Sequence, residues 1–299
     1  MRQRRRIAAY GLCRDDAGRI LLVRAAEHDD IPGVWSLPGG GIGHGEAPLR
    51  AVVREFVEET GLSTEVLRLR DVVSDVAFLR RPDALMHTDR ILYDVKVTGG
   101  ELRPEIGGTS DLAAWIEPDQ LAHLPLLPYL AGLLGLPVER EALPEAELTL
   151  DPHPTRRQRF AAYGVVTDPA GRYLLTRIAA GYPGAGTWHL PGGGTDFGEL
   201  PTAGLLRELV EETAQVGRVT GLLDVTHYHN PRAMGPERRP MDWHTVRALY
   251  RVAVDRPTSP NVVEAAGGST AEARWLDPAE LGEVRLNEFA KAAIGRSAG

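Results

Sequence analysis

Residues 37–62 read LPGGGIGHGEAPLRAVVREFVEETGL, a glycine-rich turn followed by a stretch with helical spacing. We expect the helix to run from about Ala47 to Thr60. Pro48 suits the first turn of a helix, where its missing N–H leaves no bond unmade, and Gly61 suits the position just after the last turn. The stretch therefore predicts a tight turn joined directly to one helix.

Two stripes of side chains follow this helix. One is apolar and has spacings of three and four residues: Leu49, Val52, Val53 and Phe56. The other is acidic: Glu55, Glu58 and Glu59. Three neighbouring carboxylates repel one another, and a divalent cation reverses that effect. Because Mg²⁺ takes oxygen ligands and commonly lies beside substrate phosphates, the acidic stripe predicts a Mg²⁺ site. A solvated acidic face is the alternative interpretation.

The same pattern returns in the second half of the chain. Residues 190–215 read LPGGGTDFGELPTAGLLRELVEETAQ, and the two copies align without a gap from Arg4 to Leu62 of the first. A Pro- and Glu-rich stretch, Pro137 to Pro154, has the composition of an exposed linker. We therefore predict two domains, residues 1–137 and 156–299, joined by a linker at 138–155.

The sequence of each copy predicts the same series of strands and helices around the central helix. In the first copy, strands are expected at Ile7–Cys13, Ile20–Val23, Val66–Val73, Ile91–Val97 and Trp115-Ile116. A helical stretch is expected after Pro118. Strands mixed with few helices indicate an α+β or an α/β sandwich in each copy.

The residues of the turn and helix resemble a Nudix box. Gly40, Glu46 and the run Arg54-Glu55-Phe56-Val57-Glu58-Glu59-Thr60-Gly61-Leu62 match the whole motif, and the second copy matches it from Gly193 to Glu212. The chain is therefore similar to a tandem Nudix hydrolase. The resemblance implies two α/β/α sandwiches with mixed sheets, related by internal duplication. It also implies hydrolysis of a diphosphate bond in a nucleoside diphosphate linked to another moiety.

The resemblance assigns roles to individual residues. Mg²⁺ or Mn²⁺ would be held by the glutamates of each box and by the carbonyl of the preceding glycine: Gly39, Glu55, Glu58 and Glu59 in the first copy, and Gly192, Glu208, Glu211 and Glu212 in the second. Arg54 with Glu46, and Arg207 with Glu199, would orient the turn and the helix. A metal-activated water would attack phosphorus, with Glu55 and Glu208 as candidate bases. Some members use a further glutamate in a late loop, but none stands at the expected spacing before Trp115 or Trp275.

Aromatic, cationic and imidazole side chains mark candidate substrate contacts. They are Tyr10, Arg80 and Arg81 in the first copy, and Tyr163, His227, Tyr228, Arg238, Arg239 and His244 in the second. Most of the second set lies in a long loop suited to base stacking and phosphate binding, with an ordinary polar surface loop as the alternative. A zinc site on the His227-x-His229 pair is not expected, because the sequence shows no further ligand cluster.

Composition narrows the class of protein. The 299 residues carry a formal net charge of −7 and are 43% hydrophobic, which is typical of a globular chain and argues against general nucleic-acid or membrane-surface binding. The single cysteine, Cys13, excludes an internal disulfide framework and a Cys-rich zinc site. No apolar run has the length of a membrane span or a signal peptide. We expect a cytoplasmic enzyme acting on a small phosphoanhydride.

Two alternatives to a doubly active enzyme stay open. The chain could be a nucleotide-binding sensor, or only one domain could catalyse while the other completes an intrachain pseudo-dimer; a higher oligomer is also open. We expect the two domains to pack through apolar surface with approximate two-fold symmetry. The stretch Leu124–Leu136 is apolar enough to be partly buried there, unless it closes its own domain.

The second helix is expected to end differently from the first. Ala214 stands where the first copy has Gly61, and the left-handed conformation that ends many helices would cost alanine roughly 1 kcal/mol. We therefore expect this helix to continue past Ala214 toward Gly217. The glutamates of the second copy precede that point and should keep their positions.

Overall fold

The chain forms two compact units whose bounds do not follow the sequence repeat. The first unit comprises residues 1–158 and 227–244, and the second comprises residues 159–226 and 245–299. A segment of the second copy therefore belongs to the first unit. The domain boundaries expected from the repeat remain a prediction.

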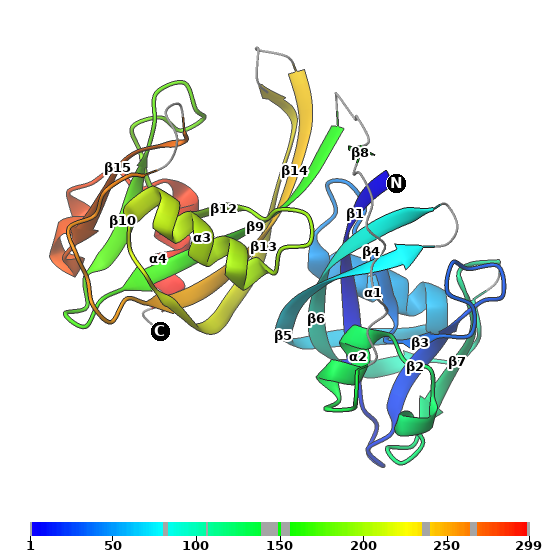
Figure 1. Cartoon of the computed structure of the whole chain (residues 1–299). Helices are drawn as coiled ribbons and strands as arrows, with labels where there is room; N and C mark the ends of the chain where they lie inside the picture. The colour runs from blue at the N-terminus through cyan, green and yellow to red at the C-terminus, as the bar shows by residue number, and fades with distance from the viewer. Residues whose placement is uncertain are drawn as a thin grey trace. The chain divides into compact units, whose positions relative to one another are not determined.

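The computed structural model describes most of the chain (Figure 1). The described residues are 2–79, 83–105, 107–138, 149–150, 156–234, 240–263 and 268–297. Within them, no helix is both long and apolar enough to cross a membrane. Most of the expected linker at 138–155 lies outside the described residues.

The first unit contains two sheets. The larger has the order β4-β1-β6-β5 with β8 paired to β1, and the smaller has the order β3-β2-β7. Their bounds are β1 (Arg2–Cys13), β2 (Ile20–Ala25), β3 (Trp35–Ser36), β4 (Gly39–Gly41), β5 (Leu62–Leu79), β6 (Ala84–Gly100), β7 (Ser110–Ile116) and β8 (Thr149–Leu150). Because β1 runs parallel to β6 and antiparallel to β4, the larger sheet is mixed, as predicted.

Alternation along β1 places helices on both faces of the larger sheet. Ala8, Tyr10 and Leu12 belong to a core cluster with α2 (Pro128–Leu133). Gly11 points the other way: a Cβ there would lie 3.1 Å from the Phe56 ring on α1 (Pro48–Thr60). Successive strand residues face opposite sides of a sheet, so one strand serves both helical layers. The predicted α/β/α sandwich is thereby confirmed for this unit.

The second copy repeats the architecture with one continuous sheet. Its order is β11-β10-β9-β14-β13, with β12 paired to β9 and β15 paired to β10. The strands are β9 (Arg156–Thr167), β10 (Tyr173–Ile178), β11 (Trp188–His189), β12 (Gly192–Gly194), β13 (Arg218–Met234), β14 (Pro240–Ala253) and β15 (Thr270–Leu276). The helices are α3 (Pro201–Thr213), the 3-10 turn η3 (Pro278–Gly282) and α4 (Glu288–Ser297).

The stretch Leu124–Leu136 closes its own unit. Leu124, Leu126, Leu133 and Leu136 pack against the same core cluster that receives Tyr10. A short 3-10 turn, η1 (Leu121–His123), precedes them, where the sequence predicted a helical stretch after Pro118. The apolar character of this segment is therefore accounted for within the first unit.

Helix α1 has the predicted bounds but a different buried face. It begins at Pro48 and is ended by Gly61 in the left-handed conformation, with φ of 73°. Leu49 was expected on the apolar face but is 52% exposed. Glu59, expected only on the acidic stripe, is instead buried with Phe56. The burial of a carboxylate is explained by the hydrogen bonds described below.

The prediction that α3 continues past Ala214 is wrong. The helix ends at Thr213, in register with α1, and Ala214 adopts the left-handed conformation with φ of 54°. The cause is tertiary. The buried Gln215 amide donates to Thr258 Oγ1 (2.8 Å) and accepts from the Thr258 backbone N–H (2.9 Å), so these bonds hold the chain where it leaves the helix.

We predict that Ala214→Gly stabilises the second unit by about 1 kcal/mol, because glycine adopts this conformation without a Cβ penalty. Native-state hydrogen exchange of the α3 amides measures the change. Ala203→Gly, at an exposed interior position of the same helix, is the matched control and should destabilise it by about 0.5–1 kcal/mol. If both substitutions stabilise the helix, or both destabilise it, the left-handed conformation of Ala214 is not the source of the strain.

Candidate functional site

The glycine turn brings strand β4 unusually close to β1. Gly39 has φ of 144° and pairs with Tyr10; a Cβ on Gly39 would lie 2.3 Å from the Ala9 carbonyl oxygen. No side chain fits there, so this position requires glycine. Gly192 repeats the arrangement, with φ of 129° and the Ala162 oxygen at the same 2.3 Å.

Glu59, in the last turn of α1, ties this helix to the glycine turn. Its Oε2 accepts a hydrogen bond from the Gly39 backbone N–H (2.8 Å), and its Oε1 accepts one from Ser110 Oγ on β7 (2.9 Å). The residue is 6% exposed. Burial raises the pKa of Glu59 to about 8, because the surroundings disfavour the charged carboxylate.

On the exposed side of the site, Arg54 donates hydrogen bonds to the glycine turn, to Glu46 and to the acidic stripe. Its Nε and Nη2 donate to the two oxygens of Glu46 (2.9 Å each), and its Nη2 also donates to the Gly41 carbonyl (3.0 Å). Glu46 in turn accepts from the Gly43 backbone N–H (2.8 Å). These bonds lower the pKa of Glu46, with the Arg54 hydrogen bond as the largest cause. They join the turn to α1, and the orienting role that the resemblance implies for this pair stays a prediction.

The same guanidinium also contacts two carboxylates of the acidic stripe. Nη1 of Arg54 lies 2.8 Å from Glu55 Oε1 and 2.9 Å from Glu58 Oε2. The Glu55 side chain is 16% exposed and that of Glu58 is 48% exposed. Desolvation raises the pKa of Glu55. The stripe therefore presents carboxylates in three environments, from buried to half-exposed.

Gly40 makes room for Glu55. A Cβ at Gly40 would lie 2.4 Å from Glu55 Oε2, so the carboxylate occupies the space that a side chain would need. The second copy has the same feature, since a Cβ at Gly193 would lie 2.7 Å from Glu208 Oε1. The glycine turn thus forms a cradle for one carboxylate in each copy.

The second copy reproduces the remaining contacts. Glu212 accepts from the Gly192 N–H (2.9 Å) and from Thr270 Oγ1 (2.6 Å). Arg207 donates to Glu199 (2.9 and 3.1 Å), the Gly194 carbonyl (3.2 Å) and Glu211 (3.0 Å), and its Nη1 lies 3.2 Å from Glu208. Burial raises the pKa of Glu208, as it does for Glu55. The altered helix end at Ala214 therefore leaves these contacts intact.

The donor set of both copies fits a hard divalent cation. Carboxylate oxygens line one helix face, and the cradle at the glycine turn holds one of them in place. The raised pKa values of Glu55 and Glu59 arise mainly from burial, and a nearby cation would counteract that cause. Oxygen donors of this kind suit Mg²⁺ or Mn²⁺. Ligation by these residues, and by the carbonyls of Gly39 and Gly192, stays a prediction.

The predicted substrate residues fall in three places. Tyr10 is 5% exposed within the core cluster, and the Tyr163 ring packs on His189 and Phe289 at centroid distances of 5.0 and 5.2 Å. His227, Tyr228 and His244 were expected in a long loop but lie on the paired strands β13 and β14, within the first unit. The remaining four, Arg80, Arg81, Arg238 and Arg239, lie outside the described residues. Substrate contact by any of these stays a prediction.

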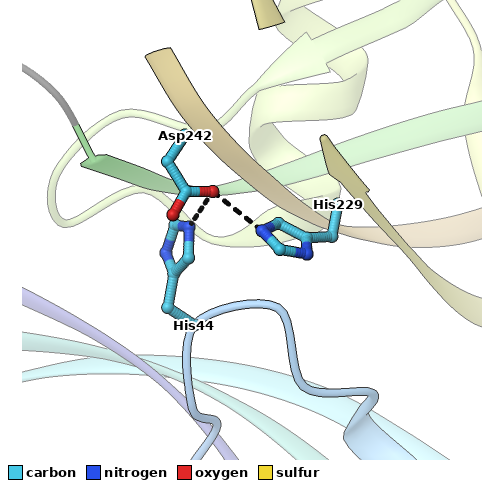
Figure 2. A group of neighbouring side chains, drawn as sticks. All are labelled: His44, His229 and Asp242. Atoms are coloured by element: carbon cyan, nitrogen blue, oxygen red, sulfur yellow. Dashed lines mark hydrogen bonds and ion pairs between the residues drawn. The ribbon is translucent and has the colours of Figure 1, made fainter. Parts of the chain in front are cut away.

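Three functional features escaped the sequence interpretation. The hydroxyl partners of the buried glutamates, Ser110 and Thr270, follow no recognisable spacing from the box. Glu105 accepts a hydrogen bond from the Ser110 N–H (3.1 Å), which brings a loop carboxylate beside Glu59's partner. Its distance from Trp115 in the sequence does not match the spacing expected for a late-loop glutamate. The third feature is a cluster around His44, shown in Figure 2 and discussed below.

Comparison with known proteins indicates one family for both copies. The family model described as the NUDIX domain matches residues 4–134 and 157–295. The RNA pyrophosphohydrolase of Agrobacterium fabrum is 47% identical over 51 residues, which are 17% of this chain and 30% of that protein. The ADP-ribose pyrophosphatase of Methanocaldococcus jannaschii is 36% identical over 97 residues, 32% of this chain and 54% of that protein.

Comparison with solved structures finds partial similarity. A MutT NUDIX hydrolase from Burkholderia pseudomallei is 28% identical, with a TM-score of 0.38 over 44% of this chain and 97% of that one. This chain spans less than a third of the Agrobacterium relative and about half of the Methanocaldococcus relative.

We predict that Gly40→Ala displaces the Glu55 carboxylate and weakens Mn²⁺ binding at the first unit about 10–100-fold. A Mn²⁺ titration of the full chain, monitored by electron paramagnetic resonance, measures the affinity of each site. The affinity of the site in the first unit should fall, and that of the site in the second unit should not change. Gly41→Ala is the control, because its Cβ meets the Arg6 side chain at an unstrained 3.4 Å. Unchanged Mn²⁺ binding in Gly40→Ala would show that Glu55 is not a ligand.

Proposed function

Because this chain belongs to the NUDIX family, whose domain model matches both copies, we propose that it is a divalent-cation-dependent pyrophosphohydrolase with one active site in each unit. Its substrate is a small molecule that contains a phosphoanhydride, such as a nucleoside diphosphate linked to another moiety. The supporting observation is the repeated arrangement of an arginine, a glycine cradle and three glutamates on one helix.

The proposed cation ligands are the three glutamates of each helix, Glu55, Glu58 and Glu59 in the first unit and Glu208, Glu211 and Glu212 in the second. When bound, a divalent cation would neutralise charge on the diphosphate and make the attacking water more acidic. Glu59 and Glu212 are anchored by backbone and hydroxyl donors, so they hold their positions with or without substrate.

Hydrolysis requires a proton acceptor next to the attacking water. The water oxygen forms a bond to phosphorus, the bridging P–O bond breaks, and the water proton passes to a base. We assign this role to Glu55 and Glu208. Each is largely buried in its glycine cradle, which fixes the carboxylate beside the helix face that would hold the cation. Arg54 and Arg207 position them from the adjacent helical residue.

Both units are proposed to be active. The contacts of the arginine and of the buried glutamate in the first site have counterparts in the second, from the glycine N–H on the buried glutamate to the arginine on the turn. Ala214, the principal departure from the motif, keeps the helix end in register. A second unit that only binds nucleotide is the alternative that the experiment below distinguishes.

The two units are proposed to prefer different substrates. Arg90 lies 4.5 Å above the Tyr129 ring in the first unit, and Arg247 lies 4.7 Å above the Phe289 ring in the second. The second unit adds His189, which stacks on Tyr163 and occupies the strand position held by Ser36 in the first. Burial lowers the pKa of His189 to about 4, so this added ring is neutral.

We predict that Glu58→Gln removes the hydrolysis due to the first unit, and that Glu211→Gln removes that due to the second. The full chain would be assayed with Mg²⁺ against a panel of nucleoside triphosphates, nucleotide sugars and dinucleoside polyphosphates. The double variant should lose at least about 100-fold in rate, because charge stabilisation in the transition state is lost.

The control is Glu65→Gln, an exposed carboxylate on β5 that belongs to neither acidic stripe, which should keep full activity. If the double variant hydrolyses its substrate at the wild-type rate, the proposed site is wrong. If Glu211→Gln changes no activity while Glu58→Gln removes all of it, the second unit is a binding or structural partner.

A further inference from the structure

Outside the two glutamate sites, one group of metal-ligating side chains stands out among the described residues. His44 lies in the turn between β4 and α1, His229 lies on β13, and Asp242 lies on β14; all three belong to the first unit. Asp242 Oδ1 is 2.9 Å from His44 Nε2 and 2.8 Å from His229 Nε2. Figure 2 shows the carboxylate facing a nitrogen of each imidazole ring.

The nitrogen of His44 is buried in a way that calls for a ligand. The His44 side chain is only 9% exposed. Its Nε2 approaches Asp242 as an ion-pair contact, but among the described residues it has no partner at a hydrogen-bonding angle. The Asp242 carboxylate, 2.9 Å away, is therefore what replaces the lost hydration of this nitrogen, and it does so without good hydrogen-bond geometry. A metal ion between the rings and the carboxylate would satisfy it.

The surroundings hold the three side chains together. The His44 ring packs edge-on against His229 (centroids 5.3 Å) and His244 (5.5 Å). His229 lies directly over the backbone at Gly45, where a Cβ would come within 2.8 Å of its ring. His244 is fully buried, and its ring also lies edge-on to His229, with centroids 5.9 Å apart.

Two imidazole nitrogens and one carboxylate oxygen are a donor set that Zn²⁺ prefers and that Mg²⁺ does not. We propose that His44, His229 and Asp242 form a Zn²⁺ site with a fourth position for water. Zinc–ligand bonds of about 2.0–2.2 Å in a tetrahedron require the ligand atoms to stand about 3.3 Å apart. The present contacts of 2.8 and 2.9 Å therefore need to open by roughly half an ångström.

This site revises the interpretation of the His227-x-His229 pair. The sequence offered no further ligands near that pair, whereas the fold brings His44 from the first copy and Asp242 from the neighbouring strand. The ion would link the β13–β14 segment to the turn that carries Glu46, the partner of Arg54. It is separate in chemistry from the all-oxygen sites on α1 and α3.

The test is a Zn²⁺ titration of the full chain after chelator treatment, with millimolar Mg²⁺ present to occupy the glutamate sites. We predict one equivalent of Zn²⁺ retained through gel filtration and quantified by elemental analysis. Co²⁺ in its place should give the intense visible absorption of a tetrahedral site. His229→Gln and Asp242→Asn should each weaken binding at least tenfold; their side chains are about one third exposed, so the fold should tolerate both.

Two controls separate this site from other metal sites. His123→Gln changes an exposed histidine outside the cluster and should retain the ion. The Glu58→Gln/Glu211→Gln double variant should also retain it, because the glutamate sites do not contribute. Circular dichroism in chelator checks that each variant is folded. Failure of the wild-type chain to retain Zn²⁺, or equal retention by His229→Gln, would overturn the proposal and leave the cluster as a carboxylate bridging two imidazoles.

Discussion

The clamp between Arg54 and Glu46 is the interaction on which the first site depends. It joins a turn that has almost no side chains to a helix that carries the acidic ones. Pairing with β1 fixes Gly39–Gly41 as a strand, and the clamp connects that strand to the exposed side of α1. Because the same guanidinium reaches Glu55 and Glu58, the clamp sets both the shape of the turn and the spacing of the carboxylates. Arg207 and Glu199 do the same in the second unit.

A second connection between the helix and the glycine turn is made by the buried glutamate of each helix. Glu59 and Glu212 bond the backbone of the glycine turn and a hydroxyl of the late strand. A buried carboxylate is costly unless it is hydrogen-bonded or paired with charge, and here each oxygen has a donor. Three segments that are far apart in the sequence therefore meet at one side chain. This convergence explains why the acidic stripe is not an ordinary solvated helix face.

Local features of the fold were predictable from the sequence, and long-range ones were not. Pro48 and Gly61 gave the bounds of α1, because caps act through neighbouring backbone. The end of α3 was mispredicted because Gln215 bonds Thr258, a contact that no local pattern reveals. The exposure of Leu49 was missed because helical spacing defines a stripe without stating what covers it. The pairing of His44 with Asp242 arises only from the tertiary fold.

The division of the chain into units has a consequence for synthesis. The first unit is built from residues 1–158 and 227–244, so its last segment leaves the ribosome well after the rest. At typical translation rates the delay is on the order of ten seconds. During that interval the turn around His44 and Gly45 lacks the segment that covers it in the finished protein. Nascent first units are therefore incomplete until much of the second copy has been made, which ties the folding of one copy to the translation of the other.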